Sequence, residues 1–335
     1  MRVAVCADME GLSGVDRYQQ CFPGWTAEYR HGVRMLVGDV GAAVEAALSA
    51  GADQVGIADW HYLGRNVPAA AFPDLPIRRL WRRGRPTIGA DSLGRPDAAI
   101  FVGVHAGAGS AEGFLSHTFW MGMSVAIDGL AVSESVLWAL ALGAEGVPVA
   151  AVAGDSRAVE EATGLLPGIP SVGVKAGTSR TSTILRPPQD AREEIAETVR
   201  DALADLPDPQ THPFPAEVTI RFADPAHAAR AADRGVAERT GPRDVAARLG
   251  SAHDLMPFLA RALLATPLGT GPALANRLLP RGTGTLARLQ SVALDPLLGW
   301  LERRVVSEWA REPAELYPEV GGRRPEGRRP PTRRS

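Results

Sequence analysis

Apolar residues in the first half of the chain fall in short runs, separated by longer stretches with a helical pattern. The runs are residues 2–7, 54–58, 98–104 and 125–127. Runs of this length, bounded by polar residues, are typical of buried parallel strands. From Tyr29 to Leu48 apolar residues recur at helical spacing, and Gly51 is a typical helix stop. Strand, helix and strand in this order form a crossover unit, which predicts an α/β fold with a mostly parallel central sheet and flanking helices.

The pattern changes further along the chain. A hairpin at Asp128-Gly129 is followed by a predicted helix from Ser133 to Gly143 and a strand over 147–153. Later segments predict helices over 191–206 and 254–264 and a strand over 217–222. We therefore expect an N-terminal α/β metal-binding domain over 1–154, a smaller α/β domain over 155–265, a helical extension over 266–320 and a disordered, Arg- and Pro-rich tail over 321–335.

Each of the four apolar runs leads to a side chain that can bind a metal ion. These side chains are Asp8 and Glu10, His61, His105 and Glu134. In an open α/β sheet the ligand site lies beyond the carboxyl ends of the strands, so residues distant in sequence can meet there. Oxygen and nitrogen donors suit zinc or a similar divalent ion. The set is large enough for two ions that share a bridging carboxylate.

Simpler interpretations exist for most of these residues. Asp8 and Glu10 at a strand end can be turn or capping acids, although the glycine that follows favours close approach to a ligand. His61 can equally be a hydrogen-bonded core histidine, and Asp59 either orients an imidazole or lies at the surface. Glu134 directly follows Ser133, and an acid at a helix start is favoured by capping and by the helix dipole alone.

Composition excludes several classes of partner. The 335 residues are 45% hydrophobic with a formal net charge of −2, which indicates an ordinary core and no general attraction to nucleic acid or anionic membrane. We expect no membrane span and, because the N-terminus lacks a signal-peptide pattern, a cytoplasmic location. Two cysteines, Cys6 and Cys21, are too few for a disulfide framework.

Seven short motifs, in order and with similar spacing, resemble the D-aminopeptidases of the DppA type (peptidase family M55). They are DMEGLSG at 8–14, DWH at 59–61, GVHA at 103–106, GFLSH at 113–117, SE at 133–134, VAGD at 152–155, and VK at 174–175 with SR at 179–180. The resemblance extends to about residue 265, and the extension from 266 has no counterpart in it. Trp60 departs from the family pattern, which commonly has a small polar residue there, and this leaves the substrate range open.

The resemblance implies a peptidase with two zinc ions per subunit that removes N-terminal D-amino acids from short peptides, as a ring-shaped homo-oligomer. Matched position by position, Asp8 bridges the two ions. Glu10 and His105 complete one site, and His61 and Glu134 complete the other. His117 becomes the catalytic residue.

Three further residues are candidates for chemistry. His117 lies in a loop near His105, where an imidazole can transfer protons, although a loop histidine is also often only bonded to backbone. Lys175 is the sole lysine of the chain, and a compact ammonium can bind a substrate carboxylate or stabilise charge on the scissile carbonyl. Arg180 is a weaker candidate for the same role, and a structural ion pair is the alternative for both.

Together these observations predict a zinc-dependent aminopeptidase of the D-Ala type that uses a water activated by two metals. Another dinuclear metallohydrolase, a phosphoesterase or an amidase, uses similar ligands and remains an alternative. A noncatalytic relative that kept only the scaffold is the other alternative.

Overall fold

The structure is a computed structural model, and it describes residues 1–22, 26–62, 64–79, 81–82, 85–86, 93–266, 304–313 and 316–321. Its central element is a seven-stranded sheet with strand order β11-β10-β9-β6-β1-β2-β3. All neighbouring strands are parallel except β10 and β11, which form an antiparallel hairpin. The strands are β1 (Arg2–Ala7), β2 (Gln54–Asp59), β3 (Ile77–Arg79), β6 (Ala98–Val104), β9 (Val149–Asp155), β10 (Ser171–Ser179) and β11 (Ser182–Leu185).

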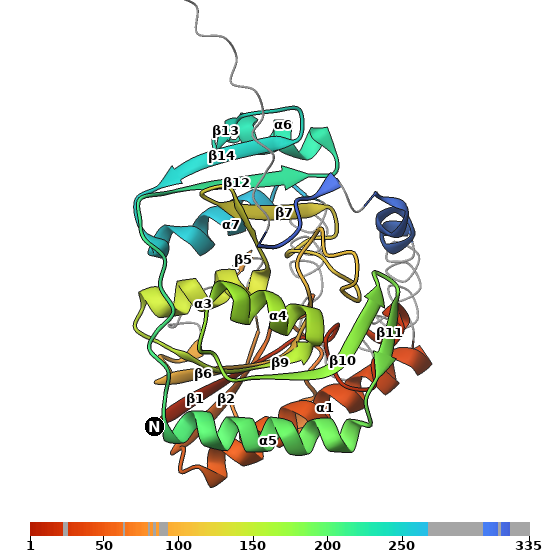
Figure 1. Cartoon of the computed structure of the whole chain (residues 1–335), viewed down its shortest axis with the longest axis vertical. Helices are drawn as coiled ribbons and strands as arrows, with labels where there is room; N and C mark the ends of the chain where they lie inside the picture. Colours follow the sequence, from red (N-terminus) through yellow and green to blue (C-terminus); the bar gives the residue numbers. More distant parts are fainter. Residues whose placement is uncertain are drawn as a thin grey trace, which may run out of the picture.

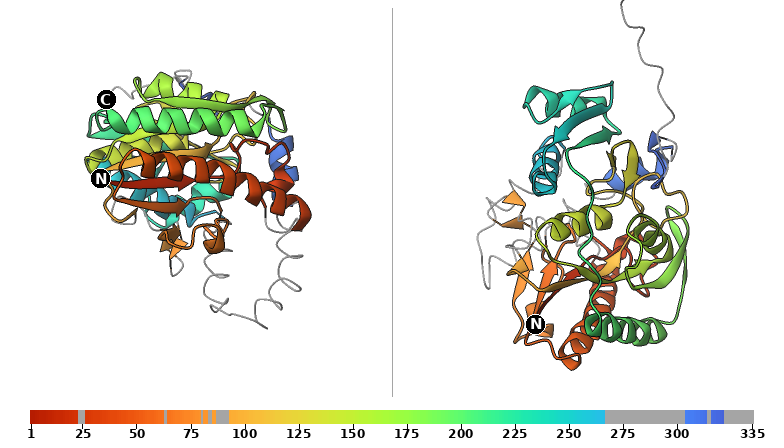
Figure 2. Two further views of the ribbon diagram at one scale, coloured as in Figure 1. Left: turned by 90° about the horizontal axis from the view of Figure 1, so that it is seen from below. Right: turned by 60° about the vertical axis from the view of Figure 1, so that its left-hand side comes forward.

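Helices cover both faces of this sheet (Figure 1). On one face lie α1 (Thr26–Ser49) and α5 (Pro188–Ala204), which run side by side in the view from below (Figure 2). On the other face lie α3 (Glu134–Ala144) and α4 (Ser156–Leu165). The apolar side chains form two buried clusters, one on each face. Burial on both faces explains why the strands of this sheet are apolar runs rather than alternating patterns.

A second sheet of five strands lies beyond α3 (Figure 1), with strand order β13-β14-β12-β7-β8 and antiparallel pairing throughout. Its strands are β7 (Met123–Ile127), β8 (Leu130–Val132), β12 (Ala216–Phe222), β13 (Glu238–Arg239) and β14 (Asp244–Leu249). The helices α6 (Pro225–Asp233) and α7 (Leu255–Leu263) lie beside this second sheet. The remaining elements are a two-stranded ribbon of β4 (Trp81–Arg82) and β5 (Arg85–Pro86), and the 3-10 turns η1 (Tyr18–Gln20), η2 (Ala69–Ala71) and η3 (Ala252–Asp254).

The predicted mixed α/β fold with a mostly parallel central sheet is confirmed. One detail was wrong: the run at 125–127 is not a parallel strand, because β7 pairs antiparallel with β12 and β8 in the second sheet. A buried strand between two antiparallel neighbours has the same apolar composition as a parallel one, so the pattern did not separate the two cases. The Asp128-Gly129 hairpin is present, with φ of 49° and 81° at its two turn residues.

The predicted division at residue 154 does not coincide with the sheets. β10 and β11 complete the first sheet, whereas β7 and β8 belong to the second, so the chain passes between the two layers more than once. Of the predicted extension, residues 304–311 are helical, and 267–303 lie outside the described residues. The predicted tail, apart from Gly321, also lies outside them.

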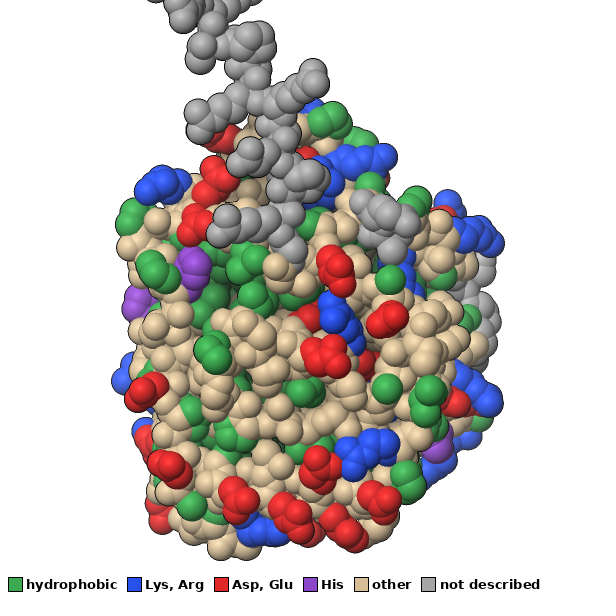
Figure 3. Space-filling model, in the orientation of Figure 1, with side chains coloured by type: hydrophobic (Ala, Val, Ile, Leu, Met, Phe, Trp, Pro, Cys, Tyr) green, Lys and Arg blue, Asp and Glu red, His purple; other side chains and the backbone are tan. Residues whose placement is uncertain are grey.

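The surface seen in Figure 3 mixes acidic, basic and apolar side chains, and acidic ones gather along its lower edge, over α5. None of the helices that the structure describes combines the length and apolar character that crossing a bilayer requires.

Candidate metal centre

Two neighbouring strand ends form the floor of the site. The Asp8 amide donates to Val102 O (2.9 Å) and the Gly11 amide donates to Gly103 O (2.9 Å), so the chain after β1 runs directly against the end of β6. A Cβ atom at Gly11 would lie 1.8 Å from the carbonyl oxygen of Val104, so glycine is required for this close approach. The contact places the residues after β1 beside His105.

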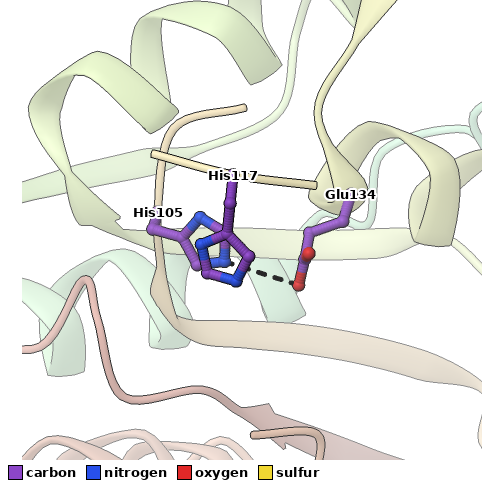
Figure 4. A group of neighbouring side chains, drawn as sticks. All are labelled: His105, His117 and Glu134. Carbon is purple, nitrogen blue, oxygen red and sulfur yellow. Dashed lines mark ion pairs between the residues drawn. The ribbon is translucent and has the colours of Figure 1, made fainter. Parts of the chain in front are cut away.

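The five predicted donors come together. Asp8 Oδ1 lies 3.0 Å from Nδ1 of His61, and Asp8 Oδ2 lies 3.4 Å from Nε2 of His105. Glu10 Oε2 is also 3.0 Å from the same nitrogen of His61. Glu134 Oε1 lies 3.5 Å from Nε2 of His105, as the dashed line in Figure 4 marks. Asp8 therefore directs one carboxylate oxygen to each histidine, as a bridging ligand would.

The histidine rings are oriented by backbone carbonyls. His61 Nε2 lies 2.6 Å from Cys21 O, and His105 Nδ1 lies 3.0 Å from Ala106 O. A carbonyl oxygen only accepts, so the ring nitrogen that faces it carries the proton. In each ring the opposite nitrogen faces the carboxylates, and it carries a lone pair that can bind a metal when the ring is neutral. Backbone carbonyls leave no trace in a sequence, so these contacts could not be predicted.

His117 lies against His105. The two rings are stacked, with centroids 4.0 Å apart and an interplanar angle of 8° (Figure 4). His117 Nδ1 donates to Leu115 O at 2.7 Å, which leaves Nε2 as its unprotonated nitrogen. Burial, reinforced by positive charge on His105, lowers the pKa of His117 to about 4. The ring is therefore neutral at neutral pH.

The cluster concentrates negative charge in a buried space. Burial, with a further contribution from Glu10, raises the pKa of Asp8 to about 7. Burial alone would lower the pKa of His105, but Glu134 and Asp8 raise it to about 10. Three carboxylates that act on two imidazoles in this way form a site complementary to a cation.

Buried atoms without a hydrogen bond support a metal in this site. Among the described residues, Glu10 Oε2 and His105 Nε2 are buried and make no hydrogen bond. Buried polar atoms of this kind are rare, and a bound ion would satisfy both. Two overlapping groups have ligand atoms within 4.8 Å of one another, and they share His105. The groups are Asp8, Glu10 and His105, and His105, His117 and Glu134.

The shortest contacts differ from the pairing that the resemblance implied. His61 lies nearest Glu10 and Asp8, whereas His105 lies nearest Glu134 and Asp8. Glu134 is not explained by helix capping: its Oε2 accepts from the amide of Phe119, and its Oε1 faces His105. Ser133 is the N-cap residue of α3, but its side chain makes no capping hydrogen bond.

Asp59 neither contacts an imidazole nor lies at the surface. Its buried carboxylate accepts from the backbone of Asn66 and Val67, and the Asn66 side chain donates to His61 O at 2.7 Å. Asp59 thus fixes the loop that carries His61.

Trp60 stacks on Trp138 of α3, with ring centroids 4.2 Å apart, so it packs between strand and helix.

Lys175 and Arg180, the two candidates for substrate contact, bind other parts of the chain. The fully buried Lys175 ammonium donates to the backbone oxygens of Glu10 and Val15. Lys175 therefore holds the loop after β1 in place through two of its backbone oxygens. The Arg180 guanidinium donates to Glu312 O at 2.9 Å and lies over the Trp309 ring. These contacts therefore do not support a direct contact between either side chain and a substrate.

Glu161 of α4, which the sequence did not single out, holds the loop after His105. It accepts from the Gly107 amide (2.8 Å) and from the Ser110 hydroxyl. Burial raises its pKa to about 7. Because this lies above the unfolded value of about 4.3, its stabilising contribution is complete below that value and is lost as the pH rises toward 7.

We therefore expect Glu161→Gln to flatten the pH dependence of the unfolding free energy. Relative to wild type, the decrease between about pH 4 and pH 7 should shrink by up to roughly 3 kcal/mol. Urea denaturation at several pH values measures this difference. Identical slopes in the two proteins would mean that the Glu161 proton is not coupled to folding.

Comparison with known proteins agrees with the geometry. Residues 1–260 match the family model of peptidase family M55, described as D-aminopeptidase. The chain belongs to the M55 D-aminopeptidase family. The predicted family is thus confirmed, and this M55 chain is a hydrolase of the aminopeptidase class.

Two similar proteins support the assignment of the M55 chain. A D-aminopeptidase of Bacillus subtilis (strain 168) is 29% identical over 233 residues, which are 67% of this chain and 82% of the relative. The solved structure of the Zn-dependent D-aminopeptidase DppA from Bacillus subtilis, described as a self-compartmentalizing protease, superposes with a TM-score of 0.69 at 26% identity. The match covers 82% of this chain and 98% of that structure.

Proposed function

We propose that this M55 enzyme is a zinc-dependent aminopeptidase that removes N-terminal D-amino acids of the D-Ala type from short peptides. The observation that carries the proposal is the meeting of Asp8, Glu10, His61, His105 and Glu134, with one ring nitrogen of each histidine held by a backbone carbonyl and the other facing the carboxylates. Nitrogen and carboxylate donors in this number suit two zinc ions per subunit. The zinc dependence of the similar Bacillus subtilis structure supports the choice of metal.

The contacts suggest how the residues share the ions. Asp8, Glu10 and His61 would hold one ion, and Asp8, His105 and Glu134 would hold the other, in accord with their shortest contacts. Ring nitrogens held by backbone carbonyls keep both imidazoles in the tautomer that binds a metal.

Bound zinc would supply a water of lowered pKa, near 7, and would polarise the scissile carbonyl. The chain itself contributes proton transfer. His117 Nε2 is unprotonated because Nδ1 donates to Leu115 O. It is therefore suited to accept a proton from the attacking nucleophile and return it to the leaving amine. The substrate's free N-terminal amine is complementary to the carboxylates of the cluster.

Metal analysis and substrate tests decide the proposal. Protein purified without chelator should contain about two zinc ions per chain and should hydrolyse D-Ala p-nitroanilide faster than L-Ala p-nitroanilide. Treatment with a chelator should abolish turnover, and added zinc should restore it. Absence of bound metal, or turnover of p-nitrophenyl phosphate in place of the anilides, would contradict it.

We also propose that the enzyme forms a ring-shaped homo-oligomer, on the strength of the self-compartmentalizing assembly named for the similar structure. Light scattering combined with size-exclusion chromatography tests this assembly. A monomer across the working range of protein concentrations would contradict it.

A further inference from the structure

Residues 304–313 and 316–321, here called the C-terminal segment, lie beyond the range that matches the M55 family model. The segment packs against the rest of the molecule, and its helix lies next to the tip of the β10–β11 hairpin (Figures 1 and 2). Trp309 of this helix is almost completely buried, at 1% exposure. A large buried side chain indicates a fixed attachment rather than a loosely lying end.

The first attachment leads to His117. The Arg180 guanidinium lies 4.0 Å from the Trp309 ring centroid and donates to Glu312 O. The carbonyl of Arg180 in turn accepts from the Leu115 amide at 2.9 Å. The Leu115 carbonyl is the acceptor that orients His117. Leu115 has a φ of 51°, an unfavourable value for a leucine, so its carbonyl direction depends on contacts such as this one.

The second attachment lies on the loop after His105. A Cβ atom at Gly107 would be 2.6 Å from Cγ2 of Val320, and one at Gly109 would be 2.4 Å from Pro318 O. The segment is therefore seated directly on these two glycines. The loop is the one that connects His105 to His117, whose amide donates to Ala106 O at 3.1 Å.

The third attachment lies before Glu134. The Gly321 amide donates to Ala131 O in β8 at 3.0 Å, three residues ahead of the carboxylate. A charged contact adds to it from α4, where Arg157 pairs with Glu319 at 2.8 Å. All three attachments thus end on the elements that carry His105, His117 and Glu134, one of the two clustered donor groups.

We propose that the C-terminal segment is a brace for His105, His117 and Glu134, and that Arg180 and Trp309 are positioning residues for His117. Their contact fixes the Leu115 carbonyl, which fixes the ring whose Nε2 transfers protons. The kinetic consequence rests on the proposed function, whereas the structural consequence does not. A displaced imidazole lowers the rate of the chemical step more than it weakens substrate binding.

Paired variants in the full-length chain test the brace. Arg180→Ala removes the guanidinium and leaves the carbonyl that binds Leu115. Trp309→Leu keeps apolar volume without a ring, and Trp309→Phe keeps a ring below the guanidinium. Arg186→Ala is the matched control, because Arg186 follows the same hairpin and also donates to a backbone carbonyl, that of Gly173.

We expect R180A and W309L to lower kcat about 10- to 100-fold with KM changed less than about threefold. W309F and R186A should stay near wild type. Hydrogen exchange, measured in the same samples, should accelerate over residues 106–118 in R180A and W309L only. Activity is expressed per bound zinc, so that metal loss does not enter the comparison.

The outcomes separate the two proposals. Unchanged exchange over 106–118 in R180A and W309L overturns the brace, as does an equal loss of kcat in R186A. If the wild type lacks peptidase activity, the proposed function fails, and the exchange data alone still decide whether the brace exists.

Discussion

Replacing Asp8 by asparagine is expected to lower kcat/KM by about 1,000-fold or more and to reduce the zinc content below that of wild type. The substitution keeps the shape of the side chain but removes its charge and one oxygen donor. Of the three carboxylates in the cluster, Asp8 alone lies within ion-pair distance of both histidines, so each site would lose a ligand. Elemental analysis and D-Ala p-nitroanilide kinetics on the same preparation measure both effects.

The matched control for this variant is Asp39→Asn. Asp39 is also a buried acid, but its oxygens accept hydrogen bonds from Ser13 and Arg192 rather than facing the histidines. Its replacement should reduce stability and leave zinc content unchanged. If D8N retained full zinc and activity, Asp8 would not be a shared ligand and the two-ion arrangement would have to be abandoned.

The location of the site was predictable because of a property of parallel sheets. Asp8 and His105 follow neighbouring strands β1 and β6, and the carboxyl ends of parallel strands lie at the same edge of a sheet. His61 follows β2, the other neighbour of β1, and joins them for the same reason. The apolar run followed by a polar donor is therefore a sound signal wherever the strand belongs to this sheet.

Glu134 joins the same site but does not follow a strand of the first sheet. Its preceding strands β7 and β8 belong to the second, antiparallel sheet, so the carboxyl-end rule does not apply to them. The strand pattern placed Glu134 among the donors only through the turn after the run at 125–127, and its metal role rested mostly on the motif resemblance. Its position depends on how α3 packs between the two sheets, and such packing of distant segments is not encoded in local periodicity.

The supporting contacts were beyond prediction for a related reason. The carbonyls that orient the imidazoles belong to Cys21, Ala106 and Leu115, and any residue type supplies a carbonyl. Lys175 stands out as the sole lysine of the chain, but a solitary lysine indicates neither its partner nor its side of the loop. Only the fold shows that it binds backbone oxygens of the segment after β1.

Replacing His117 by glutamine is expected to lower kcat about 100- to 10,000-fold, the usual range for loss of a proton-transfer group. Glutamine keeps a hydrogen-bonding group of similar length but has no titratable nitrogen. KM should change little, because the substrate amine and carbonyl are bound by other groups. Zinc content should remain at about the wild-type value, since His61, His105 and the three carboxylates are untouched.

The zinc measurement makes this prediction decisive, because His117 also lies within ligand distance of His105 and Glu134. If H117Q loses zinc together with activity, His117 is a ligand and the proton-transfer role is wrong. His31→Gln is the matched control: its ring also bonds a backbone carbonyl, that of Gly14 at 3.0 Å. We expect near-normal turnover in H31Q and a large loss in H117Q. This result would show that a histidine matters for the chemistry because it lies beside the metal donors, and not because it bonds a backbone carbonyl.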